Sequence, residues 1–237
     1  MQLKSLISTD IFKESSVQQH EIGAKGELAD GRIFRYGLAG EAITIGYITV
    51  APAIDTATIT MAVTTAAAIG ATSISFTHGA TTSTANEYKD GFATISYGTG
   101  IGQTLKVKDH AALTSAQTGC VVNLDDPIIV ALDTTSKLDL AHNPWRGVMM
   151  TASQVTTPTG ASLIGMTSAY YGWLQTRGIC GIYADNTITA GYEINCDAST
   201  AGAVDISATN EFQRWPVGHA IQAGANTYCH QVFLEID

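Results

Sequence analysis

The feature that most constrains the fold is a series of short segments in which apolar residues alternate with threonine, serine or lysine. They include residues 56–63 (TATITMAV), 72–77 (TSISFT), 91–98 (GFATISYG), 102–109 (GQTLKVKD) and 120–124 (CVVNL). A period of two with many β-branched residues is typical of half-buried strands. Such strands recur roughly every 10–15 residues, which predicts a sandwich or a barrel.

The last segment, residues 228–237, alternates in the same way, with Val232 and Leu234 on one face and Gln231 and Phe233 on the other. We expect its apolar face to cover a core, so that the chain ends in a built-in strand. Residues 170–185 predict a strand, a glycine break and a second strand. No stretch beyond the first 20 residues shows helical periodicity, and the predicted fold class is therefore all-β.

Composition shifts along the chain divide it into three predicted parts. Residues 1–30 are the most polar and are expected to form an extended N-terminal arm, with a short helix capped by Thr9 or Asp10 as the alternative. Residues 31–158 predict a middle β domain, sandwich-like or barrel-like. Residues 159–237 predict a small C-terminal β-barrel.

Charge restricts the partners of this chain. Only 14% of its residues are charged, and the formal net charge is −9. Phosphate contacts need lysine and arginine, so we expect no direct binding to nucleic acid. The start of the chain lacks the apolar core of a signal peptide, and no apolar run reaches the length of a membrane span. These patterns predict a protein made in a reducing cytoplasm that does not contact a membrane.

Three glycines at alternate positions, Gly98, Gly100 and Gly102, invite comparison with phosphate-binding loops. The dinucleotide fingerprint needs G-x-G-x-x-G before a helix, and the P-loop needs G-K-[ST]. Here the spacing is G-x-G-x-G, and a strand-like segment follows. The stretch therefore predicts a hairpin whose glycines supply positive φ angles or a bulge.

Other chemical motifs are missing from the sequence. There is no HExxH, HxH, CxxC or G-x-S-x-G pattern, so we expect no enzymatic activity, no metal site and no cofactor. Three of the four cysteines lie in strand-like surroundings that favour buried thiols, and the sequence leaves a Cys180–Cys196 or a Cys180–Cys229 disulfide open.

Several stretches together resemble capsid decoration (cement) proteins of tailed bacteriophages. They are, in chain order, ADGRIFRY, TANEYKDGFATISYGTGIGQTLKVK, LDLAHNPWRGV, YYGWLQTRGICGIYA, TAGYEINCD and PVGHAIQA. The closing segment is similar to the small β-barrel of lambda-type head decoration proteins. Ala190-Gly191, Asp197, Gly202 and Val217-Gly218-His219-Ala220 occupy the turn and strand positions of that pattern.

The resemblance implies a structural virion protein that binds the outer surface of the assembled capsid and stabilises the shell. It implies the major capsid protein and further copies of this chain, as trimer or dimer, as partners. It implies the virion surface as the location, after synthesis in the host bacterial cytoplasm. The extra unit near residues 50–150 departs from the smallest decoration proteins.

Four residues on the first strand-like segment are the candidates for capsid contact. Arg32 and Arg35 could pair with acidic capsid residues, while Ile33 and Phe34 could fill a groove. The equally weighted alternative is that residues 33–36 simply begin the first core strand. An alternative function is host recognition by a tail or head-fibre protein that binds a surface glycan through exposed aromatics. A β-fold hydrolase is a third hypothesis, and no motif in the sequence supports it.

Overall fold

The computed structural model describes residues 4–6, 9–152, 156–206 and 215–237. Strands make up 43% of the chain and helices 3%, so the fold is all-β, as predicted. The chain forms two compact units. Unit 1 comprises residues 1–52 and 144–237, and unit 2 comprises residues 53–143. No helix in the described ranges is long and apolar enough to span a membrane.

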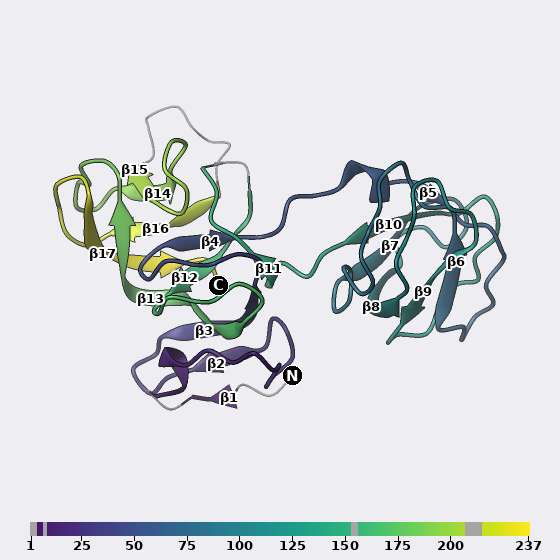
Figure 1. The fold of residues 1–237 in the computed structure, drawn as a ribbon, viewed down its shortest axis with the longest axis horizontal. Coiled ribbons are helices and arrows are strands. Elements are labelled where there is room, and N and C mark those ends of the chain that lie inside the picture. The colour runs from purple at the N-terminus through teal and green to yellow at the C-terminus, as the bar shows by residue number, and fades with distance from the viewer. Residues whose placement is uncertain (1–3, 7–8, 153–155, 207–214) are drawn as a thin grey trace. The chain divides into compact units, whose positions relative to one another are not determined.

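Unit 2 is a ring of six strands with its own core (Figure 1). The order is β5-β10-β7-β8-β9-β6, and a bridge between Val63 and Phe76 returns the last strand to the first. The bounds are β5 Met61–Ala62, β6 Ser73–Phe76, β7 Phe92–Tyr97, β8 Thr104–His110, β9 Cys120–Leu124 and β10 Lys137–Ala141, with a 3₁₀ turn η2 at Thr56–Thr58. Inward residues such as Ile74, Ile95 and Leu138 are fully buried, because each strand alternates between the core and the outside.

The glycine-rich stretch joins β7 to β8, which pair antiparallel. Gly98, Gly100 and Gly102 have φ angles of 79°, 81° and 92°. A side chain disfavours that backbone conformation, so the hairpin interpretation of these glycines is confirmed.

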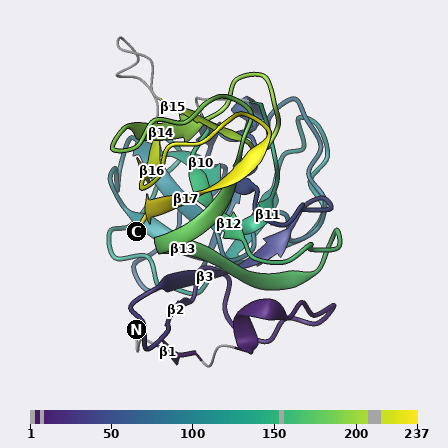
Figure 2. The ribbon, with the colours of Figure 1, turned by 90° about the vertical axis from the view of Figure 1, so that its left-hand side faces the viewer.

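Unit 1 is organised by one long strand, β13 (Tyr171–Ala184). Its first half pairs with β3 (Ile33–Ala39), and its second half pairs with β17 (Tyr228–Glu235). Figure 2 shows β13 between these two strands. The predicted glycine break does not interrupt this strand. Gly178 has a φ angle of +91° but lies within the continuous β13. The chain changes partner near this glycine instead of ending a strand.

A second ring closes around the latter half of β13. The sheet runs β13-β15-β14-β16-β17, and β17 pairs back to β13. The new members are β14 Glu193–Cys196, β15 Val204–Ile206 and β16 Pro216–Ala220. Ile182, Val217, Val232 and Leu234 are fully buried within its core. The predicted inward face of the C-terminal strand is thus confirmed for Val232 and Leu234.

The remaining strands of unit 1 extend this sheet. They are β1 Lys4–Ser5, β2 Lys25–Glu27, β4 Ile48–Val50, β11 Arg146–Val148 and β12 Pro158–Ser162, with a 3₁₀ turn η1 at Asp10–Phe12. Strand β2 pairs with β3, and Ile11, Ile22 and Leu28 are buried in a core cluster with Phe34 and Trp173. The described part of residues 1–30 therefore packs into unit 1, which differs from the expected arm.

The two units share a motif of paired turns. In each, two pairs of turns face one another through reciprocal backbone hydrogen bonds: Ile43 with Met166 and Ile188 with Gly224 in unit 1, Ala67 with Leu132 and Ser83 with Leu113 in unit 2. In seven of these eight turns, the residue three positions later has a positive φ angle: Gly46, Gly70, Asn86, Ala116, Ala169, Gly191 and Thr227. The recurring positive φ directs the chain from the bridge into the next segment.

Candidate interaction site at the junction of β3, β13 and β17

The candidate capsid-contact residues lie at a three-strand junction in unit 1. Arg177 of β13 is in register with Ile33 of β3 on one side and with Glu235 of β17 on the other. The β3–β13 register shifts between Gln175 and Arg177, which marks a β-bulge at Thr176. Such bulges bend a strand and re-aim the side chains beside it.

An ion pair and hydrogen bonds fix the junction from within. The Arg35 guanidinium donates to both carboxylate oxygens of Asp237 at 2.7 Å, and also to the Gly23 carbonyl oxygen at 2.9 Å. The guanidinium also lies 5.0 Å from the centre of the Trp145 ring. Thr176 donates to the Asp237 carboxylate at 3.1 Å. The pair is largely buried, with 19% and 15% of the side chains exposed.

The same contacts set the protonation of Asp237. Burial raises its pKa, but the hydrogen bond and charge of Arg35 and the Thr176 hydroxyl outweigh burial, so the pKa is lowered. Asp237 therefore remains a carboxylate at neutral pH and holds the end of the described chain against β3.

The four candidate residues have different roles in this structure. Phe34 is fully buried in the unit 1 core, and Arg35 is engaged by Asp237. Their placement matches the alternative in which this segment begins a core strand. Arg32 and Ile33 are partly exposed. Capsid contact by any of the four stays a prediction, and Arg32 and Ile33 are the two whose side chains have surface to offer.

A hollow opens beside Arg32, which we call the Arg32–Arg177 hollow. It has a volume of about 580 Å³ and is lined by Asp30, Gly31, Arg32, Arg177, Gly178, Ile179 and Phe233. Ile179 and Phe233 are register partners on the outer face of β13 and β17, and they are 52% and 36% exposed. A hollow lined by an exposed apolar pair and two arginines is suited to a ligand that is both apolar and charged.

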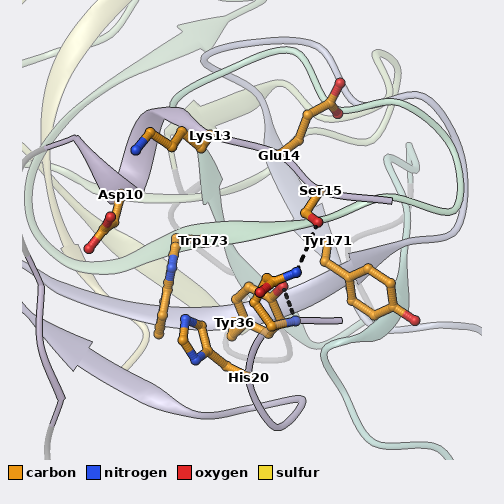
Figure 3. A pocket seen from close by; sticks show the side chains of 9 residues that line it. Asp10, Lys13, Glu14, Ser15, His20, Tyr36, Tyr171 and Trp173 are labelled. Atoms are coloured by element: carbon orange, nitrogen blue, oxygen red, sulfur yellow. Dashed lines mark hydrogen bonds between the residues drawn. The ribbon is translucent and has the colours of Figure 1, made fainter. Parts of the chain in front are cut away.

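A second, smaller hollow lies where residues 10–20 cross β3 and β13 (Figure 3). Its aromatic wall is formed by His20, Tyr36, Tyr171 and Trp173, and its volume is about 250 Å³. The His20 ring contacts Tyr36 edge-on at 5.0 Å, and the Gln19 backbone N–H donates to the Tyr36 hydroxyl. Tyr36 and Trp173 are each only 3% exposed, so they offer little surface on which a sugar could stack.

Histidine, serine and acidic side chains elsewhere in the described ranges form hydrogen bonds, among them Ser83 with His78 and His219 with Glu235. No group of three histidine, cysteine or acidic residues there could hold a metal ion. Cys120, Cys180, Cys196 and Cys229 are all free thiols, so neither disulfide left open by the sequence is present. Burial raises the pKa of Cys180 to about 12 and that of Cys196 to about 11, so both stay protonated at neutral pH.

Sequence reasoning missed Arg177, Ile179 and Phe233 as surface residues of one site. Two signals were present. Arg177 is one of only two basic residues between residues 147 and 237, and Phe233 lies opposite the inward face in the alternation of the last strand. What brings them beside Arg32 is strand pairing over long sequence separations, which no local pattern reveals.

Comparisons with protein-family models, with curated proteins and with solved structures found no match to this chain.

Proposed function

We propose that this chain is a structural protein of a tailed-phage virion that binds the outer surface of the assembled capsid and stabilises the shell. In this role it binds the major capsid protein, associates with further copies of itself, and performs no chemical reaction. The proposal rests on the sequence resemblance, together with one observation on where the resembling residues lie.

That observation concerns the closing segment alone, whose pattern residues lie in a single closed ring of strands in unit 1. Gly191 and Gly202 have φ angles of 80° and 75° at its turns. One Asp197 carboxylate oxygen accepts from the backbone N–H groups of Ser199 and Thr200, at 2.5 and 2.6 Å. Residues 217–220 lie in β16, next to the last strand. The motif residues thus have turn and strand roles, which supports a shared small-barrel architecture over a chance match of glycines.

Electron cryomicroscopy of virions that carry or lack this protein tests the proposal. We expect density for it on the outer capsid surface in the first sample, and bare positions with lower resistance to heat or low salt in the second. The proposal would be contradicted if neither sample showed this density and the two capsids resisted heat and low salt equally. The host-recognition alternative stays a prediction, and specific binding on a glycan array by virions that carry the protein elsewhere would favour it.

Truncation is a poor test of capsid contact in this fold. Removing residues 1–30 would take away β2 and the buried side chains of Ile11, Ile22 and Leu28, so loss of binding would only report unfolding. Point substitutions on the exposed side of the junction are the better probe.

A further inference from the structure

The Arg32–Arg177 hollow stands out because its two arginines keep hydrogen-bonding capacity. The Nε and the backbone N–H of Arg32 both donate to Asp30, at 2.9 and 3.1 Å. This leaves the terminal nitrogens of Arg32 without an acceptor among the described residues. Arg177 donates from Nη1 to the backbone carbonyl of Asp237 at 3.1 Å. A guanidinium has five N–H donors, so each side chain can bind a further acceptor.

The side-chain carboxylates near Arg177 are bound by other groups. Glu235 lies opposite it in the β13–β17 register but is 2.7 Å from His219 Nδ1. Asp237 binds Arg35 through both carboxylate oxygens. Arg177 forms no ion pair with a side-chain carboxylate of the described ranges, and its Nη1 donates to the main-chain oxygen of Asp237, the last residue. Its remaining N–H groups can still donate to an external carboxylate.

The floor of the hollow is shaped for close approach. Gly31 and Gly178 both have positive φ angles, and a Cβ atom at Gly178 would lie 3.0 Å from Cγ of Arg32. The glycine therefore leaves room for the arginine stem to lie across β13. Ile179 and Phe233 remain exposed beside it.

We infer that the Arg32–Arg177 hollow binds an acidic segment of a partner protein. One carboxylate of that segment is held by the Arg32 and Arg177 guanidinium groups, and an apolar side chain beside it covers Ile179 and Phe233. The identification of the partner as the major capsid protein rests on the proposed function. The chemistry of the bound segment does not, because it follows from the lining residues.

A peptide titration tests the chemistry without a capsid. The probe is acetyl-Asp-Leu-Asp-Leu-amide, and its control is the neutral acetyl-Asn-Leu-Asn-Leu-amide, each added to the full chain at low salt and followed by amide NMR. We expect saturable shifts at Gly178, Ile179 and Phe233 with the acidic peptide, and binding weaker by about fivefold or more with the neutral one. Absence of saturable shifts there, or equal binding of the two peptides, would overturn the inference.

Matched variants locate the site. Arg177→Gln is expected to weaken binding of the acidic peptide by about fivefold, and Ile179→Ser is expected to weaken binding of both peptides. Lys108→Gln, which removes one exposed charge in unit 2, is expected to bind as the wild type does. Unchanged binding by Arg177→Gln would overturn the inference. Because Arg177, Ile179 and Lys108 are all at exposed positions, we expect melting temperatures equal to that of the wild type, which would show that the variants are folded.

Capsid binding and oligomeric state separate the possible occupants. If the wild type binds expanded capsids and Arg177→Gln binds less, the acidic segment belongs to the capsid protein. Equal capsid binding by the two would remove the capsid protein as the occupant. A lower oligomeric state of Arg177→Gln in sedimentation would assign the hollow to a second copy of this chain and overturn the inference. If the wild type does not bind capsids but does bind the acidic peptide, the result contradicts the proposed function and leaves the inference about the hollow standing.

Discussion

The two units share a motif of paired turns but differ in how far their sheets extend. Each has two pairs of turns joined by reciprocal hydrogen bonds, and each closes a ring of strands around an apolar core. Unit 2 stops at its six-stranded ring. In unit 1, β13 is 14 residues long and runs past its ring to pair with β3. The comparison suggests that the ring supplies stability, while the extension of one strand creates the junction that carries the candidate site.

The cores also differ in the titratable groups that they bury. In unit 2, Tyr88 is buried with its ring 5.6 Å from His110 and 4.6 Å from His142, and His78 is buried nearby. The Tyr88 hydroxyl and His78 Nδ1 lack a hydrogen-bond partner among the described residues, as does Gln175 Oε1 in unit 1. Buried polar atoms of this kind lower the stability of a core unless water reaches them. Unit 2 should therefore be more sensitive than unit 1 to changes in the charge of its histidines.

The largest expected effect comes from removing one core side chain in each ring. Leu234 in unit 1 and Leu138 in unit 2 are both fully buried. Leu234→Ala and Leu138→Ala should each lower the free energy of unfolding of their own unit by about 2–5 kcal/mol. Hydrogen exchange resolved by peptide measures each unit within the full chain. For Leu138→Ala we expect loss of protection in residues 53–143 alone. If β13 and β17 also became less protected than in the wild type, the division into two cores would be contradicted.

Breaking the ion pair at the junction should affect unit 1 alone. Arg35→Gln leaves the Asp237 carboxylate without its cation in a mostly buried site, and we expect a loss of roughly 1–3 kcal/mol, reduced from the fully buried case by the remaining exposure. All three tryptophans of the chain, Trp145, Trp173 and Trp215, are in unit 1, so a chemical melt followed by tryptophan fluorescence measures this loss. Lys13→Gln, which removes an exposed charge of unit 1, serves as the control. An Arg35→Gln melt equal to the wild type would argue against an ion pair that holds β3 to the residues after β17.

These partners also show what the sequence could predict. Alternation is local, so it located β6, β7, β8, β9 and β17 to within one or two residues. Pairing is not local: Arg35 and Asp237 are 202 positions apart in the sequence, and the paired strands β3 and β13 are separated in the sequence by all of unit 2. The boundaries at residues 30 and 158 therefore differ from those of the structure, where residues 53–143 separate the two pieces of unit 1. For the same reason the sequence named Phe34 and Arg35 as surface candidates, although their partners lie in distant segments.

The turns offer a smaller and closely matched comparison. Gly70 in unit 2 and Gly191 in unit 1 have φ angles of 87° and 80°, and a Cβ atom at either would meet nothing within 4 Å. Gly70→Ala and Gly191→Ala should therefore cost only the backbone strain of a left-handed residue, about 1–2 kcal/mol each. Similar losses in thermal melts would support one shared turn device. A loss at one position and none at the other would show that the two turns are alike in form only.

The smallest expected effect is a difference in acid response between the units. Burial lowers the pKa of His78, while the charges of Asp55 and Glu87 oppose that shift and His110 adds to it. A histidine with a lowered pKa in the folded state binds fewer protons than in the unfolded state, so its contribution is fully present above its ordinary pKa of about 6.5 and declines as pH falls below it.

The Asp237 contribution behaves differently. Its pKa lies below the ordinary carboxyl value, so the stability it provides is lost only as pH falls from about 4 toward that lower value. Between pH 7.5 and 5.5, hydrogen exchange corrected for its intrinsic pH dependence should therefore increase in residues 53–143 and change less around β13 and β17. His78→Gln should remove the His78 part of that increase, whereas an unchanged increase in this variant would assign the acid response to the other histidines around Tyr88.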